Sequence, residues 1–162
     1  MRPHTQRLLH NLDDIRKEFT ETVSPIEDDE LDWAPADGMK SYRALLQEIG
    51  AMEKLCTHWL ANGGLLEWDM SAYAPSATTQ SALRELGTIR DETRAYLQNA
   101  SEEKLETLID VPADWQQYMG PQIEPEEVVR WIGQHEYYHL GQIISYRWAQ
   151  GHSPYGGATA EA

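Results

Sequence analysis

Apolar residues recur every three or four positions in four long stretches of this sequence, and polar residues fill most of the positions between them. This spacing is typical of amphipathic helices that bury one face. In the first stretch the repeating apolar residues are Leu8, Leu12, Ile15, Phe19 and Val23. The pattern predicts an all-α protein, and four long helices in a chain of 162 residues indicate a four-helix bundle.

The residues that flank these stretches supply start and stop signals for helices. Pro3 and Pro125 suit a first helical turn, whereas Pro25 must follow the end of the first helix. Ser41 is the expected N-cap of the second helix, and the sequence Asn-Gly-Gly at residues 62–64 is its expected end. The third helix is predicted over residues 80–98, and the fourth is predicted to end near residue 151.

The connections between these helices are predicted to be turn-rich. Residues 65–79 form a loop long enough for us to expect that it lines a site. Ser101 is the expected cap of a short extra helix, and residues 109–123 have an uncertain state, with an extended conformation as one option. We found no repeat or linker, so residues 1–152 are predicted to form one domain, followed by a short flexible tail at 153–162.

Composition excludes several classes of partner. The net charge of −14 would repel nucleic acid and anionic membrane surfaces, which bind mainly through Lys and Arg. No segment is apolar and long enough to span a bilayer. The single cysteine, Cys56, fits a reducing compartment and is expected to be a small buried apolar residue. We therefore expect a cytoplasmic protein without a nucleic-acid or membrane partner.

The predicted fourth helix places two histidines on the stripe that faces the core. His135 and His139 are four residues apart, so they differ by roughly 40° around the helix and can hold one metal ion together. Glu136 lies about 100° from His135 and should point away from that stripe. The alternative is that each imidazole only makes a hydrogen bond to a core tyrosine or carbonyl.

The predicted second helix supplies a third candidate ligand. Glu48 lies within its apolar face, between Leu45 and Met52. A carboxylate on a buried face is unfavourable unless a cation or strong donors meet it. A divalent ion held by Glu48, His135 and His139 would meet that need and leave positions open for water or substrate. A salt bridge of Glu48, or a less buried face, is the alternative.

The segment His135 to His139 also matches His-Glu-x-x-His, the pattern of zinc metalloproteases. Such enzymes need a further ligand downstream and usually a sheet beside the helix, but only His152 and Glu161 follow, in a glycine-rich tail. Gln142 and Ser145 occupy the positions where the extended motif has glycine and histidine. The sequence therefore argues against a protease.

Two separate segments resemble the DinB/YfiT-like superfamily. The stretch "HEYYHLGQIISYR" is similar to its last-helix signature, His-Glu-x-x-His-x-Gly-Gln followed by an aliphatic run and an arginine. The stretch "LDWAPADGMKSYRALLQEIGAMEKL" is similar to the segment that leads into its second helix, with Trp33, Pro35, Gly38 and Ser41 in the expected order. The resemblance extends from about residue 5 to 152.

This resemblance implies an up-down-down-up four-helix bundle, often a homodimer, with a divalent metal ion between helices. His135 and His139 match the two family ligands on the last helix. The family's usual third ligand is a histidine where this chain has Glu48. This departure would favour a harder ion or a site of two histidines and one carboxylate, or it would indicate a changed function. Zinc, nickel, iron and manganese all stay open as the metal.

The resemblance also implies a metal-dependent enzyme that transfers a low-molecular-weight thiol to an electrophile, in detoxification or a stress response. Bacillithiol, mycothiol and glutathione are thiols of this kind, and the metal would lower the pKa of the bound thiol. The partners would then be a small-molecule thiol and an electrophilic substrate. The alternatives are a non-catalytic stress protein in which the metal braces the bundle, and a metal-dependent hydrolase.

Overall fold

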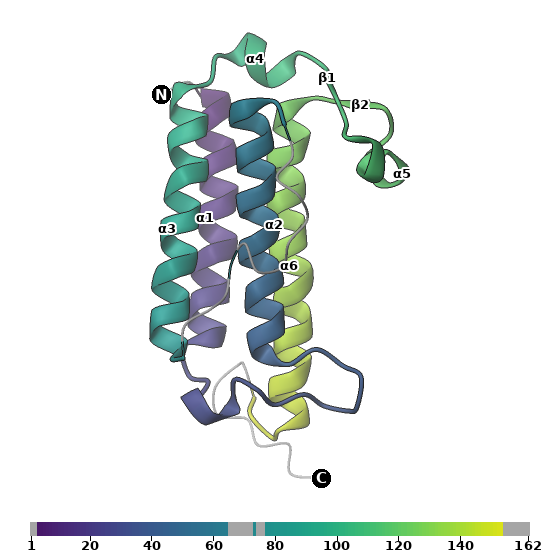
Figure 1. Cartoon of the computed structure of the whole chain (residues 1–162). Coiled ribbons are helices and arrows are strands. Elements are labelled where there is room, and N and C mark those ends of the chain that lie inside the picture. Colours follow the sequence, from purple (N-terminus) through teal and green to yellow (C-terminus); the bar gives the residue numbers. More distant parts are fainter. Residues whose placement is uncertain (1–2, 65–72, 74–76, 154–162) are drawn as a thin grey trace.

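The four predicted helices form a bundle in the computed structural model, which describes residues 3–64, 73 and 77–153. The helices are α1 (Pro3–Val23), α2 (Tyr42–Asn62), α3 (Thr79–Asn99) and α6 (Pro125–Ala149). In Figure 1, α1 and α6 run downwards and α2 and α3 run upwards, so the up-down-down-up topology is confirmed. Helices α1 and α2 each pack against α3 and α6. Within the described ranges, no helix is long and apolar enough to cross a membrane.

The helix ends follow the local signals in the sequence. The Ser41 side chain accepts a hydrogen bond from the backbone N–H of Ala44 at 3.3 Å, which caps α2. Gly63 ends the same helix in the left-handed conformation, with φ of 76°, and its N–H donates to the Trp59 carbonyl. Ser101 caps α4 (Glu102–Glu106), as predicted. The loop before α2 contains one 3-10 turn, η1 (Asp28–Glu30).

An excursion from the bundle connects α4 to α6. It consists of β1 (Ile109–Asp110), η3 (Ala113–Trp115), α5 (Gln116–Met119) and β2 (Gln122–Ile123), and the two strands pair antiparallel. Strands therefore account for four residues of the segment 109–123. The residues between the strands form helical turns, because Trp115 and Met119 pack there against the apolar core.

The long loop predicted at residues 65–79 lies largely outside the described part, as do residues 154–162 of the predicted tail. Of this loop, the structure describes Tyr73 and residues 77–79. The side chain of Tyr73 is buried. Its ring lies against Gly50 of α2, where an added Cβ would come within 2.3 Å of the ring. The tyrosine hydroxyl donates to the Ala82 carbonyl, which ties the loop to α3.

Two apolar clusters make up the core, and a layer of charged residues lies between them. One cluster contains Phe19 and Leu140, and the other contains Leu12 and Ile132. Between these positions, each helix of the bundle contributes one charged side chain to an ionic layer. The four residues of this layer are Arg16 of α1, Glu53 of α2, Arg90 of α3 and Glu136 of α6.

The ionic layer pairs two carboxylates with two guanidinium groups in the interior. Arg90 donates to Glu53 at 2.6 Å and to Glu136 at 2.5 Å, and Arg16 donates to the same two residues at 2.8 and 2.5 Å. The remaining donors reach the helix carbonyls of Leu86 and Leu12. The side chains of Glu53 and Glu136 are each only 1% exposed. The layer is therefore electrically neutral, and its carboxylates are fully desolvated.

Burial acts against ionisation of Glu53, but its partners overcome that effect. Desolvation would raise the pKa of Glu53, whereas the charges of Arg90 and Arg16, with hydrogen bonds from Arg90 and Thr93, lower the pKa below its ordinary value. Thr93 itself donates to the carboxylate at 2.8 Å. Removing one partner from such a cluster is costly because it leaves an uncompensated buried charge.

We expect the substitution Glu136→Gln to lower the free energy of unfolding by about 3–5 kcal/mol, because Arg16 and Arg90 would share a single carboxylate. Urea denaturation of the metal-free protein measures this change. Glu127→Gln is the matched control on the same helix, since Glu127 is 47% exposed and its pair with Arg130 should contribute about 0–1 kcal/mol. Equal effects of the two substitutions would contradict a structural role for the layer.

Candidate metal centre

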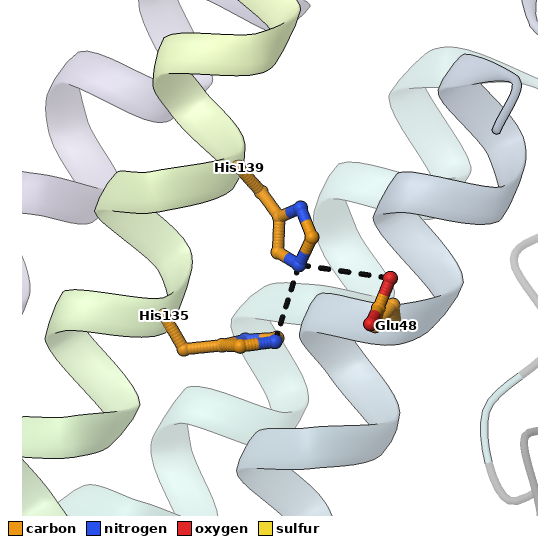
Figure 2. A group of neighbouring side chains, drawn as sticks. All are labelled: Glu48, His135 and His139. Carbon is orange, nitrogen blue, oxygen red and sulfur yellow. Dashed lines mark hydrogen bonds and ion pairs between the residues drawn. The ribbon is translucent and has the colours of Figure 1, made fainter. Parts of the chain in front are cut away.

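The three predicted ligands come together between α2 and α6. Figure 2 shows His135 and His139 on neighbouring turns of α6 and Glu48 facing them from α2. Their nearest ligand atoms all lie within 4.8 Å of one another. The Nε2 atom of His139 is 3.1 Å from Nε2 of His135 and 3.6 Å from Oε2 of Glu48. The helical spacing thus brings two imidazoles together, and the packing of α2 on α6 adds the carboxylate.

These distances fit a divalent ion with nitrogen and oxygen ligands. Two nitrogen ligands of a tetrahedral zinc ion, each bound at about 2.0–2.1 Å, lie roughly 3.3 Å apart. The two Nε2 atoms of His135 and His139 are already close to this separation. Two neutral imidazoles and one carboxylate form a donor set that zinc, iron, nickel and manganese all accept.

Gln142 holds the ring of His139 in place. Its side-chain oxygen lies 2.7 Å from Nδ1 of His139 and accepts the hydrogen of that nitrogen. The lone pair of His139 is then on Nε2, which faces His135 and Glu48. Partners of this kind commonly orient metal-bound histidines and set their tautomer. Tyr138 continues the chain, since Gln142 donates to its hydroxyl at 3.3 Å.

The surroundings keep both imidazoles neutral near pH 7. Burial, with a smaller contribution from His139, lowers the pKa of His135 to about 4. Burial also lowers the pKa of His139, against opposing effects of Gln142 and Glu48. Because only a neutral imidazole has a lone pair for a metal, the site is ready to bind a cation without first losing a proton.

Glu48 also has a partner within the protein. Its carboxylate forms an ion pair with Lys40, which lies in the loop just before α2, and the Glu48 side chain is 18% exposed. The salt bridge considered from the sequence is therefore present, and Glu48 is less buried than its apolar neighbours suggested. Lys40 and a metal ion would compete for the same carboxylate oxygen.

A cavity of about 330 Å³ adjoins the candidate metal centre. Glu48 and His135 form part of its wall. The other described residues that line it are Met52, Trp115, Tyr118, Met119 and Trp131. The site is thus open toward a space in which a small molecule could approach the ligands.

Glu136 points away from the metal ligands, as expected, but its environment was not foreseen. It is buried in the ionic layer with Arg16 and Arg90 rather than placed beside the site. It cannot serve as the base of a protease there, and the described strands comprise only two residues each. The sequence contained a signal for this layer, because Glu53 and Arg90 also occupy core-facing positions of their helices.

Cys56 takes no part in the site. It is fully buried in the apolar core, and burial raises the pKa of its thiol, so the thiolate that would act as a nucleophile is disfavoured. The expectation that Cys56 is a small buried apolar residue is confirmed.

Comparisons with known proteins agree with this fold. The sequence profile of the DinB superfamily matches residues 11–143. YfiT from Bacillus subtilis, described as a probable metal-dependent hydrolase with an unusual four-helix bundle topology, is 14% identical with a TM-score of 0.75, over 94% of this chain and 91% of its own.

Two further solved structures are similar. A conserved protein from Enterococcus faecalis is 20% identical with a TM-score of 0.70, over 93% of this chain and 99% of its own. The DinB-like protein YjoA from Bacillus subtilis is 19% identical with a TM-score of 0.69, over 91% and 93%. No curated protein matches significantly. The chain belongs to the DinB superfamily, since the matched region covers most of its length.

We expect His139→Ala to abolish stoichiometric binding of zinc, because the remaining ligands, Glu48 and His135, would no longer surround the ion. Metal analysis of the purified proteins after dialysis measures this. His10→Ala is the control, since His10 is an exposed histidine. Glu136→Gln should keep its metal despite its lower stability. Equal metal content in wild type and His139→Ala would rule out the site.

The stability of the metal-free protein should fall as the pH decreases from about 6.5 toward 4. His135 has an ordinary pKa of 6.5 in the unfolded chain and a pKa of about 4 when folded, so the unfolded state binds more protons within this window. Urea denaturation at a series of pH values, with a chelator present, measures the slope. His135→Gln should make the slope shallower, and an unchanged slope would contradict the assignment.

Proposed function

We propose that this protein binds a divalent metal ion through Glu48, His135 and His139 and transfers a low-molecular-weight thiol to an electrophile. The observation that carries the proposal is the convergence of three ligand atoms within 4.8 Å at the wall of a cavity. A metal that only braced a bundle would need no adjoining space for a small molecule. Structural metal sites are usually closed by protein ligands, whereas catalytic sites keep positions open.

The residues of the site suit activation of a thiol. Glu48, His135 and His139 would hold a divalent cation, which would lower the pKa of a bound thiol and so make a thiolate available near neutral pH. In the transfer, the sulfur forms a bond to an electrophilic carbon, the leaving group departs with its bonding electrons, and the thiol proton passes to solvent. Gln142 keeps His139 oriented throughout. The anionic Glu48 reduces the net positive charge of the site compared with a third imidazole.

Hydrolysis is the second candidate function, and one observation favours it. The structurally similar YfiT is described as a probable metal-dependent hydrolase. An open metal position can activate water as well as a thiol. The third candidate is a metal-binding stress protein without catalytic activity, in which the ion adds to the stability of the bundle by binding only the folded state.

The proposal includes a cytoplasmic homodimer that acts on small molecules and not on nucleic acid. The net charge of −14 supports the absence of nucleic acid, and the presence of a single cysteine, the buried Cys56, supports a reducing compartment. An uncharged stripe on the exposed side of α6 supports self-association, since Tyr137 and Trp148 are 57% and 55% exposed and Gly141 between them has no neighbour within 4 Å of an added Cβ. Light scattering of the purified protein measures its mass in solution.

The three candidate functions predict different outcomes of one assay. We expect metal-loaded protein, mixed with chlorodinitrobenzene and each of glutathione, bacillithiol and mycothiol, to form a thiol adduct that mass spectrometry identifies. His139→Ala should reduce the rate to that of the uncatalysed reaction, and His10→Ala should leave it unchanged.

A water-derived product that forms equally without thiol would instead support hydrolysis. If neither product forms with a wider panel of electrophiles, and metal removal lowers the melting temperature, the result would support the hypothesis of a non-catalytic metal-binding protein.

A further inference from the structure

We propose that the cavity beside the metal ligands binds the flat, uncharged, apolar part of the electrophilic substrate and excludes anionic groups. This inference rests on the proposed function, because it names the substrate class of the same site. It concerns the space that Glu48 and His135 share with the aromatic residues of the excursion between α4 and α6.

Aromatic rings form most of the cavity's apolar wall. Trp131 stacks on His135, with ring centroids 5.5 Å apart and an interplanar angle of 28°. Trp115 lies 6.2 Å from Trp131, and it also makes an edge contact with Trp59 at 6.0 Å. A continuous row of rings therefore leads from the apolar core to a metal ligand. Such faces favour a planar group, which can stack between them.

Two methionines complete the wall. Met52 comes from α2 and Met119 from α5, so they approach the cavity from the bundle and from the excursion. Thioether side chains are flexible and polarisable, and they make favourable contacts with aromatic groups. A pocket of tryptophan and methionine thus accepts aryl groups of somewhat different shape without a specific hydrogen bond.

The charge of the cavity selects against anions. Among its described lining residues, Glu48 is the single charged side chain, and no Lys or Arg is present. Lys40 pairs with Glu48 but is not part of this wall. In the metal-free protein, a carboxylate or sulfonate placed in the cavity would lose its hydration without gaining a cationic partner among these lining residues. The lining residues by themselves therefore favour an uncharged group over an anionic one.

The volume of the cavity limits the size of the bound group. About 330 Å³ lies at the lower end of the range of small-molecule sites, roughly 300–1,000 Å³. This space accommodates one or two fused rings. Tyr118, at the cavity wall, is 76% exposed, which places it at the rim. The short helix α5 therefore helps to determine which substrates fit.

Two fluorescent probes with the same ring system test the proposal. N-phenylnaphthylamine is uncharged, and anilinonaphthalenesulfonate carries an added sulfonate. We expect chelator-treated protein to bind one molecule of the uncharged probe, detected by energy transfer from tryptophan, and to bind the sulfonate at least about tenfold more weakly. Met119→Glu should weaken binding of the uncharged probe by about tenfold, because the substitution adds a second carboxylate to the cavity wall.

A second pair of variants guards against loss of folding. Tyr118→Ala removes an exposed side chain from the cavity rim and should weaken binding of the uncharged probe. Tyr137→Ala removes an exposed tyrosine that does not line this cavity and should leave that binding unchanged. Equal affinity for the two probes, or equal effects of the two tyrosine variants, would overturn the proposal. Probe binding that falls as protein concentration rises would also overturn it, because a second copy would then fill the cavity.

The outcome of the probe experiment can be distinguished from the outcome of the thiol-transfer assay that tests the proposed function. Probe binding is measured without metal and without turnover, and His139→Ala should retain it. Selective binding together with absent thiol transfer would refute only the proposed function. Thiol transfer without selective binding would refute only the assignment of the cavity.

Discussion

The arrangement of the bundle depends on a neutral cluster of four buried charges, to which each long helix contributes one residue. Each carboxylate of this cluster meets both guanidinium groups, so a shift of one helix along its neighbours would separate buried ion pairs. Apolar clusters on either side tolerate small sliding movements, but a displaced buried charge is costly. We infer that this layer fixes the register of α2 against α6.

The register of these two helices also determines the candidate metal centre. Glu48 and Glu53 are little more than one turn apart on α2, and His135 and Glu136 are adjacent on α6. One face of each helix supplies the ionic layer, and a neighbouring face supplies the ligands. The motif His-Glu-x-x-His therefore serves two purposes here, with its histidines at the site and its glutamate in the core. The same sequence pattern occurs in metalloproteases, but there its glutamate acts as the catalytic base, whereas Glu136 is buried in the ionic layer.

Glu48 distinguishes this site from one with three imidazoles. Its negative charge attracts Lys40 as well as a metal ion, so the protein has an internal cation that competes for the ligand. The two histidines, by contrast, are neutral because of burial, and Gln142 orients one of them. The site thus combines a preformed imidazole pair with a carboxylate that would have to release Lys40 in order to bind a metal ion.

Much of the fold and the ligand set followed from local patterns. The period of apolar residues and the caps at Ser41, Gly63 and Ser101 determine helices by interactions within a few residues, so the sequence by itself was sufficient for them. The pairing of His135 with His139 is equally local, because one helical turn separates them. The ionic layer, the pair of Lys40 with Glu48 and the aromatic cavity join residues that are distant along the chain or lie in different elements. Only the tertiary structure decided them, because whether a charge on a helix is buried and paired depends on which side chains the other helices bring to it.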